Sequence, residues 1–317
     1  MTSRLVLEWL REGELDLPLP GKGQTRRRWR RLADLTERDV VAGRLAEAHA
    51  DAVAILAELD GALPTADDLW GVWAAEAPDA TVTARAAADC MRLEGTKAWC
   101  SGAGLCTRAL VTARVDDGTR ALFAVDLRED GVHLLSSTWQ NCGMAASDTR
   151  SVEFLGAPAI PVGRPGDYLA RPGFWFGAIG VAACWLGGAR AVAAPLYQRL
   201  ATGVADDHAA AHLGAVDSAI TAAEATLAAA ADHVDADPGN RSGMAELTAR
   251  RARAVVETAV DETITRTARA LGPAPLCLDE QHARRVADLT VYVRQSHAER
   301  DLAALGVLAA AAVPARS

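Results

Sequence analysis

The stretch Leu93–Ile160 opens with LEGTKAWCS (residues 93–101) and contains CGMAASDT (residues 142–149). Short apolar runs lie between these two segments, at residues 109–113, 121–125 and 132–135, with turn residues at 116–118 and 129–131. Short apolar runs at regular spacing, separated by Gly and Asp turns, predict a small antiparallel sheet or barrel. The sequence on either side is rich in alanine and helical in pattern, so we expect a β domain between helical flanks.

The flanks contain long segments in which apolar residues recur at helical spacing. One such segment runs from Trp29 to Leu59, before Asp60 and Gly61. Four more follow the β stretch, at about residues 174–202, 206–234, 244–271 and 279–311, and long helices joined by short turns predict a four-helix bundle. The predicted chain is therefore mainly α with a central β domain. We expect an N-terminal helical domain over residues 1–68, a middle antiparallel β-barrel over 69–166, and the four-helix bundle over 167–317.

Composition narrows the class of protein and its partners. The net charge of −8 argues against nucleic acid as a partner, and we interpret the basic run at residues 26–31 as the solvated start of a helix. The six cysteines form no CxxC pair and no secretory signal opens the chain, which favours reduced thiols and a cytoplasmic location. The longest apolar stretch, Phe174–Leu186, contains Gly177 and Gly180, so we expect a buried helix and no membrane span.

Three segments resemble motifs of the acyl-CoA dehydrogenase-like flavoproteins. Leu93–Ser101 is similar to their L-x-G-x-K-x-W-[IC]-[ST] segment, and Gly143–Phe154 to their G-M-R-[AG]-[ST]-x-[TS]-x-x-[VL]-x-F segment. Arg199 and Gly203 are spaced as in their R-x-x-F-G, with Thr202 in place of Phe. The resemblance covers roughly residues 70–310. It implies an FAD-dependent oxidoreductase that acts on the Cα–Cβ bond of an acyl thioester.

The resemblance also implies which residues bind FAD: Trp99, Cys100, Ser101, Trp73, Ala74, Ala75 and Arg199. Trp99 would pack on the flavin, and the Ser101 hydroxyl and N–H would bond the polar edge of the ring. The backbone of residues 73–75 would face the other side of the ring, and Arg199 would meet the diphosphate, which suits a guanidinium. The alternatives are a core Trp99, an ordinary strand-end hydroxyl at Ser101 and a surface Arg199.

The sequence departs from the family at the positions of the catalytic base. Residues 169–172 read LARP at one family position for a glutamate, and residues 292–297 read YVRQSH near the other. His297 is the candidate base, because imidazole titrates in the required range. The alternative is a solvated helix histidine beside Glu299 and Arg300.

Two further family segments are incomplete. The T-E-P-x-x-G-S-D loop survives only as AEAPDA at residues 75–80, and the Q-x-x-G-G-x-G segment reads ARALGP at residues 268–273. His208 and His212 lie four residues apart on a helix, but no third ligand is evident at useful spacing, so we predict no metal site.

The leading expectation is an acyl-CoA dehydrogenase-like flavoenzyme with an altered or lost base. Its substrate would be an acyl-CoA or acyl-carrier thioester, and it would assemble as a homodimer or homotetramer, with an electron-transfer partner. Two alternatives keep the fold and change the chemistry. One is a non-catalytic scaffold or partner subunit, and the other is a flavin-dependent monooxygenase.

Overall fold

The computed structural model describes residues 2–87, 90–203 and 206–312, which form two compact units. The first, here called the β unit, comprises residues 1–17, 44–141 and 145–174, and the second, the helical unit, comprises residues 18–43, 142–144 and 175–317. The elements of the β unit are α1 (Thr2–Arg11), most of α3 (Val40–Glu58), β1 (Trp70–Trp73), β2 (Val82–Ala86), β3 (Met91–Cys100), β4 (Arg108–Arg114), β5 (Arg120–Asp126), β6 (Val132–Leu134), the short 3₁₀ helix η1 (Ala145–Ser147), β7 (Arg150–Val162) and α4 (Asp167–Ala170).

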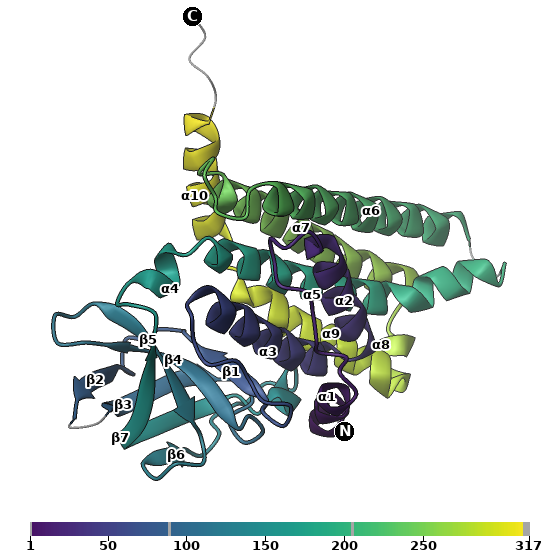
Figure 1. Ribbon diagram of the computed structural model, residues 1–317. Coiled ribbons are helices and arrows are strands. Elements are labelled where there is room, and N and C mark those ends of the chain that lie inside the picture. The colour runs from purple at the N-terminus through teal and green to yellow at the C-terminus, as the bar shows by residue number, and fades with distance from the viewer. Residues whose placement is uncertain (1, 88–89, 204–205, 313–317) are drawn as a thin grey trace, which may run out of the picture. The chain divides into compact units, whose positions relative to one another are not determined.

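The strands of the β unit form a barrel (Figure 1). The pairing order β4–β2–β3–β7–β5 closes on itself because β5 also pairs with β4, while β1 and β6 are added to β4 and β7. The expected β-barrel is thus present, with one difference in strand direction. Most pairs are antiparallel, but β1 and β2 each run parallel to β4. The parallel β1–β4 pair arises because β1 arrives from the helical N-terminal part of the chain rather than through a hairpin.

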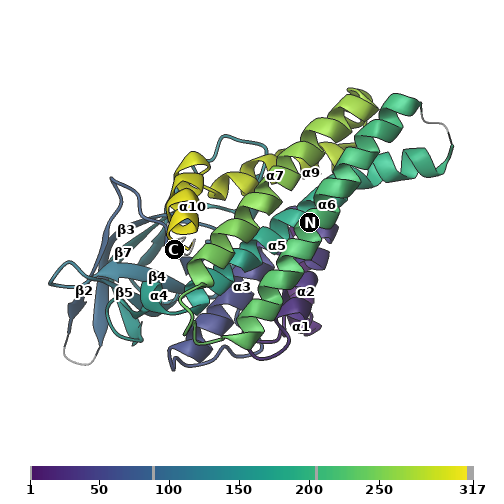
Figure 2. The same cartoon turned by 90° about the horizontal axis from the view of Figure 1, so that it is seen from above.

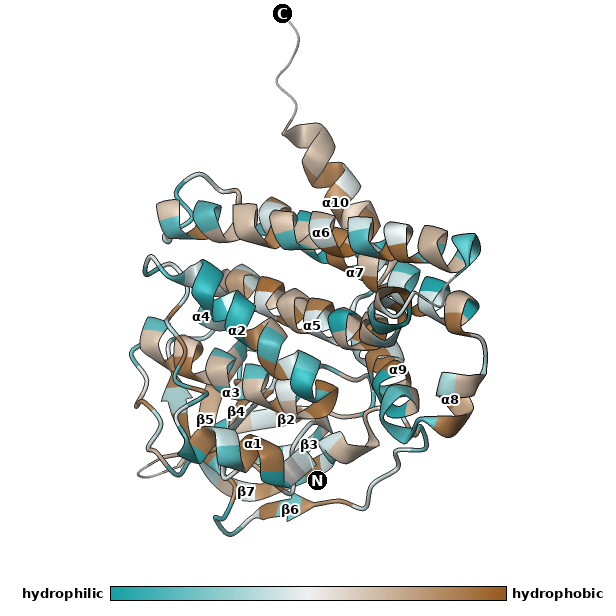
Figure 3. Cartoon of the chain, turned by 90° about the vertical axis from the view of Figure 1, so that its right-hand side faces the viewer, coloured by the Kyte–Doolittle hydropathy of each residue, from teal (hydrophilic) through white to brown (hydrophobic). Residues whose placement is uncertain are grey.

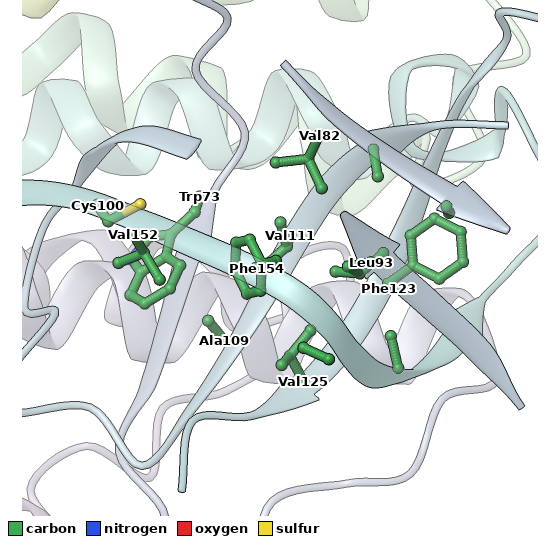
Figure 4. Packing of buried hydrophobic residues seen from close by; sticks show 14 of the residues in the cluster. Trp73, Val82, Leu93, Cys100, Ala109, Val111, Phe123, Val125, Val152 and Phe154 are labelled. Carbon is green, nitrogen blue, oxygen red and sulfur yellow. The ribbon is translucent and has the colours of Figure 1, made fainter. Parts of the chain in front are cut away.

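Alternating side chains of the strands fill two separate cores. One set fills the barrel interior and includes Val111, Phe123 and Phe154 (Figure 4). The next residues along β4 and β5, Leu110 and Leu122, point to the opposite face, where they meet α3 and α4. Because both faces are covered, β4 reads as a continuous apolar run instead of an alternating one.

The helical unit contains the long helices that the sequence predicts. Its elements are α2 (Thr25–Arg38), α5 (Gly173–Ala201), α6 (Asp207–Ala236), α7 (Ala245–Leu271), α8 (Ala274–Leu278), α9 (Glu280–Tyr292), the 3₁₀ turn η2 (Val293–Gln295) and α10 (Glu299–Ala311). Figure 2 shows α5, α6, α7 and α9 side by side along much of their length. Gly187 of α5 lets α2 approach closely, since a Cβ there would lie 2.0 Å from the carbonyl oxygen of Ala33.

The fourth predicted helix, residues 279–311, is instead two helices. The helical structure is interrupted at Ser296–Ala298, where Ala298 has a φ of 46°. The Ser296 hydroxyl donates to Glu257 of α7 at 2.6 Å, and this tertiary bond has no signature in the local helical spacing. Beyond the break, α10 has no buried residue and extends past α6 and α7 (Figure 3).

The division into domains at 68 and 166 differs from the two compact units. The N-terminal helices are shared between them, because α2 packs against α6 whereas most of α3 packs on the sheet. Helix α5 is long and apolar enough to cross a membrane by length and composition, but 78% of its apolar window is buried. The apolar composition of α5 is therefore explained by its burial within the protein.

Candidate functional site in the β unit

The two sequence segments that decide the fold meet at one end of the barrel. The loop after β3 hydrogen-bonds to the segment before β7: Gly102 N–H donates to the Ser147 carbonyl at 2.7 Å, and Gly104 N–H to the Asp148 carboxylate at 2.8 Å. Arg150 holds the same carboxylate through its Nε at 2.9 Å. Residues 101–104 and 147–150 are therefore fixed against each other.

Trp99 is turned out of the barrel by a bulge in β3. The register between β3 and β7 shifts between Lys97 and Cys100, and Trp99 has a φ of 61°. A left-handed backbone is unusual for a bulky side chain, and bulges of this kind re-aim side chains next to functional sites. Trp99 is 59% exposed, so it is not a core residue. The Trp139 ring meets it edge to face, with ring centroids 6.3 Å apart.

Ser101 lies beside Trp99 and ends a row of three hydroxyl groups. The Thr149 hydroxyl donates to the Ser101 Oγ at 2.9 Å, and the Ser147 and Thr149 hydroxyls are 2.7 Å apart. Ser147 and Thr149 are buried and Ser101 is half-buried. The Trp73 indole N–H donates to the Ser101 carbonyl at 3.0 Å, which fixes the backbone of Ser101 to the end of β1.

The predicted FAD-binding residues of the β unit divide into three groups. Trp99 and Ser101 present side chains at the surface of the β unit. Trp73 and Cys100 direct their side chains into the barrel core, where burial raises the pKa of the Cys100 thiol, so neither side chain is available to a ligand. Ala74 and Ala75 follow β1, half-buried and exposed respectively, and offer only backbone and methyl groups.

The remnant AEAPDA segment is held to the strands of the barrel by ion pairs of Glu76. Glu76 accepts from the buried Lys97 ammonium at 3.1 Å and forms a second ion pair with Arg114 at 3.3 Å. Burial raises the pKa of Glu76, but the charges of Lys97 and the neighbouring arginines outweigh burial and lower it overall. A carboxylate held in this way acts as a structural anion.

Two predicted site residues lie in the helical unit and have local partners there. The Arg199 guanidinium donates to the Ala270 carbonyl at 3.0 Å, which places it at the carboxyl end of α7. His297 has a side chain that is 60% exposed, with its Nδ1 3.7 Å from Asp301. The structure therefore gives Arg199 a helix-capping contact and places His297 at the start of α10.

Two buried or mostly buried carboxylates of the helical unit are not among the site residues that the sequence predicts. Asp288 on α9 is buried and accepts from the Met144 N–H at 2.6 Å, and burial raises its pKa to about 6. Glu257 on α7 accepts from the Ser296 hydroxyl. Their burial depends on helix packing, which spacing along one helix does not reveal.

The surface formed by Trp99 and Ser101 fits the flavin that the sequence predicts. An exposed indole can cover a planar ring, and a hydroxyl beside it can bond the ring's polar edge. Among the described residues, no group of three or more His, Cys, Asp or Glu side chains is placed to hold a metal ion.

The chain has the acyl-CoA dehydrogenase-like fold, as the sequence motifs predict. Residues 74–156 match the family described as acyl-CoA dehydrogenase, middle domain. No curated protein matches the sequence.

Solved structures with this fold cover nearly the whole chain at low sequence identity. Dibenzothiophene monooxygenase TdsC from Paenibacillus sp. A11-2, in complex with FMN and indole, is 19% identical with a TM-score of 0.75, covering 96% of this chain and 94% of its own. Nitrososynthase from Micromonospora carbonacea var. africana is 18% identical with a TM-score of 0.77, covering 97% and 88%. FkbI, for biosynthesis of a methoxymalonyl extender unit, is 16% identical with a TM-score of 0.82, covering 98% and 93%.

Proposed function

We propose that this protein is a flavin-dependent monooxygenase that binds its flavin at Trp99 and Ser101. The observation that carries the proposal is the bulge in β3, which holds an exposed Trp99 beside the Ser101 hydroxyl. Such strain at an exposed aromatic residue is typical of ligand sites. TdsC, which has this fold, is named a dibenzothiophene monooxygenase and has been solved with FMN.

The absence of a glutamate at the two family positions favours oxygenation over thioester dehydrogenation. At the first position Arg171 stands in an ion pair with Glu58 at 2.7 Å, and near the second stands the exposed His297. A dehydrogenase needs a fixed base to take the α-proton, whereas a reduced flavin, when bound, supplies the electrons that activate dioxygen. In this proposal Trp99 covers the ring, and His297 is the candidate group for proton transfer.

FMN fits this chain better than the FAD that the motifs imply. FAD extends the single phosphate of FMN to a diphosphate that carries adenosine. The motif offers Arg199 for this diphosphate, and that guanidinium already donates to the Ala270 carbonyl. The segment that cradles FAD in the family keeps one glycine here, Gly272. We also propose that the protein is cytoplasmic and forms a homodimer or homotetramer. A separate reductase would supply its reduced flavin.

Titration with FMN and with FAD, followed by flavin fluorescence and visible absorbance, tests the cofactor. We expect FMN to bind at least as tightly as FAD, and tighter binding of FAD that is lost in Arg199→Gln would contradict the assignment. A protein that takes up neither flavin would be the non-catalytic scaffold.

Oxygen consumption in the presence of FMN, NADH and a flavin reductase tests the reaction. We expect candidate substrates to increase product formation only when dioxygen is present. Product formed without dioxygen would contradict oxygenation.

Acyl thioester dehydrogenation is the second candidate, and Glu257 favours it. This carboxylate is mostly buried, with a side chain 14% exposed, and it contacts the Ser296 hydroxyl in the late part of the helical unit. Bleaching of bound flavin by an acyl-CoA panel without dioxygen or NADH, lost in Glu257→Gln, would establish this activity.

A further inference from the structure

The three hydroxyl groups at the end of the barrel have a fixed hydrogen-bond direction. A hydroxyl carries one hydrogen, and Thr149 uses its hydrogen on the Ser101 oxygen at 2.9 Å. Thr149 therefore has none left for Ser147, so in the 2.7 Å contact between them Ser147 is the donor. The row runs in one direction, from Ser147 to Thr149 to Ser101.

The last hydrogen of the row has no acceptor within the part of the chain that the structure describes. The Ser101 oxygen accepts from Thr149, and the Ser101 carbonyl is held separately by the Trp73 indole. Ser147 is 1% exposed and Thr149 8% exposed, so water does not compete for the first two hydroxyls. Each donated bond polarises the next oxygen, which makes the terminal hydroxyl a stronger donor.

We infer that Ser147 and Thr149 are positioning residues that commit the Ser101 hydroxyl to donate a hydrogen bond to an acceptor atom on the polar edge of the flavin. The inference rests on the proposed flavin site, and it adds that the ligand edge beside Ser101 is an acceptor. It also explains the tight connection of the two segments: the β3–β7 contacts that fix Gly102 to Ser147 and Gly104 to Asp148 keep the three hydroxyls in line.

Substitutions along the row test the inference through the flavin spectrum and affinity. Thr149→Val keeps the shape of the side chain and removes the bond to Ser101, so we expect FMN binding about 3- to 10-fold weaker, as one hydrogen bond allows, and a shifted visible band of the bound flavin. Ser147→Ala leaves that bond in place and removes only the polarising donor, so a smaller change in the same direction is expected. Thr149→Ser restores the hydroxyl and is expected to restore both values.

Thr83→Val is the matched control, because Thr83 lies on β2 and its hydroxyl donates to the Glu94 carbonyl outside the row. Circular dichroism confirms folding of each variant, and Ser147→Ala carries the test if Thr149→Val does not fold. If the wild type binds FMN and all row variants match it in affinity and spectrum, the inference is wrong while the flavin site stands. If the wild type binds no flavin, both are wrong.

Discussion

Lys97 shows at the scale of one residue how a buried charge is accommodated in the β unit. Its ammonium donates to the Thr112 hydroxyl at 2.8 Å, to the Thr112 carbonyl at 3.1 Å and to the Glu76 carboxylate at 3.1 Å. The residue is 1% exposed, and burial is the main cause of its lowered pKa. The family motif G-x-K therefore contributes a structural ion pair here, and the lysine fixes the segment that follows β1.

Removal of this ammonium is expected to destabilise the β unit. Lys97→Met leaves the buried Thr112 carbonyl and hydroxyl without their shared donor, while Glu76 keeps its ion pair with Arg114, so we expect a cost of about 1–3 kcal/mol. Urea unfolding measures the change. Lys22→Met at an exposed position is the control, with an expected change of about 0.5 kcal/mol or less. Equal effects of the two substitutions would contradict a structural role for Lys97.

Trp99 is expected to matter for the ligand and not for the fold. Asn tolerates its left-handed φ of 61°, so Trp99→Asn should change the unfolding free energy by about 1 kcal/mol or less, while FMN binding weakens about tenfold. Trp73 in the barrel core gives the contrast, because Trp73→Asn should cost about 3–5 kcal/mol. A large loss of stability in Trp99→Asn would contradict this prediction and show that Trp99 packs in the core.

At the scale of elements, local spacing predicted what each segment is, and tertiary contacts decided where it ends. The helical pattern over residues 279–311 is correct for α9 and α10 but misses the break, because Ser296 finds its partner Glu257 on another helix. The motif at residues 93–101 predicted a flavin contact at Trp99, yet its exposure comes from the bulge between β3 and β7. The same limit applies to Ser101 and Thr149, whose contact spans 48 positions of sequence.

The segment Cys142–Met144 is anchored on α9 by Asp288, and this contact should depend on pH. Gly143 permits the approach, since a Cβ there would lie 2.2 Å from the Ala287 carbonyl oxygen. Burial, and to a lesser extent the charge of Asp39, raise the pKa of Asp288 from 3.8 to about 6, while the Met144 N–H and Arg284 lower it. The folded chain thus binds more protons at this carboxyl than the unfolded chain between these two pH values, so stability falls as the pH rises through this window.

Asp288→Asn isolates this contribution, because the amide oxygen still accepts from Met144 and no longer titrates. Between pH 4 and pH 7 the wild type should lose up to about 3 kcal/mol of unfolding free energy relative to the variant, most of it by pH 6. Urea unfolding of both proteins over this range gives the difference directly, and contributions shared by both cancel. Parallel stability curves would show that Asp288 titrates alike in the folded and unfolded chains.

At the scale of the whole molecule, the fold was predictable because two short motifs and a helical pattern agree with each other. The first motif and the part of the second from Ala145 onward lie in the β unit, where they meet beside Trp99 and Ser101. The four long helical segments lie in or lead into the helical unit. The chemistry was less predictable because the residues that differ from the family, Arg171, Arg199 and His297, have roles set by their partners. Glu58, Ala270 and Asp301 are those partners.

Hydrogen exchange with and without FMN should locate the ligand within the chain. A ligand that binds only the folded state and is present at about 100 times its dissociation constant stabilises that state by about 2.7 kcal/mol. The free energy of every local unfolding step that releases the ligand rises by the same amount. We expect the slowing of exchange to be largest in residues 97–105 and 145–150, which hold Trp99 and the hydroxyl row, and smallest in α6. Slowing confined to the helical unit would contradict a flavin held at Trp99 and Ser101, whatever the affinity for FMN.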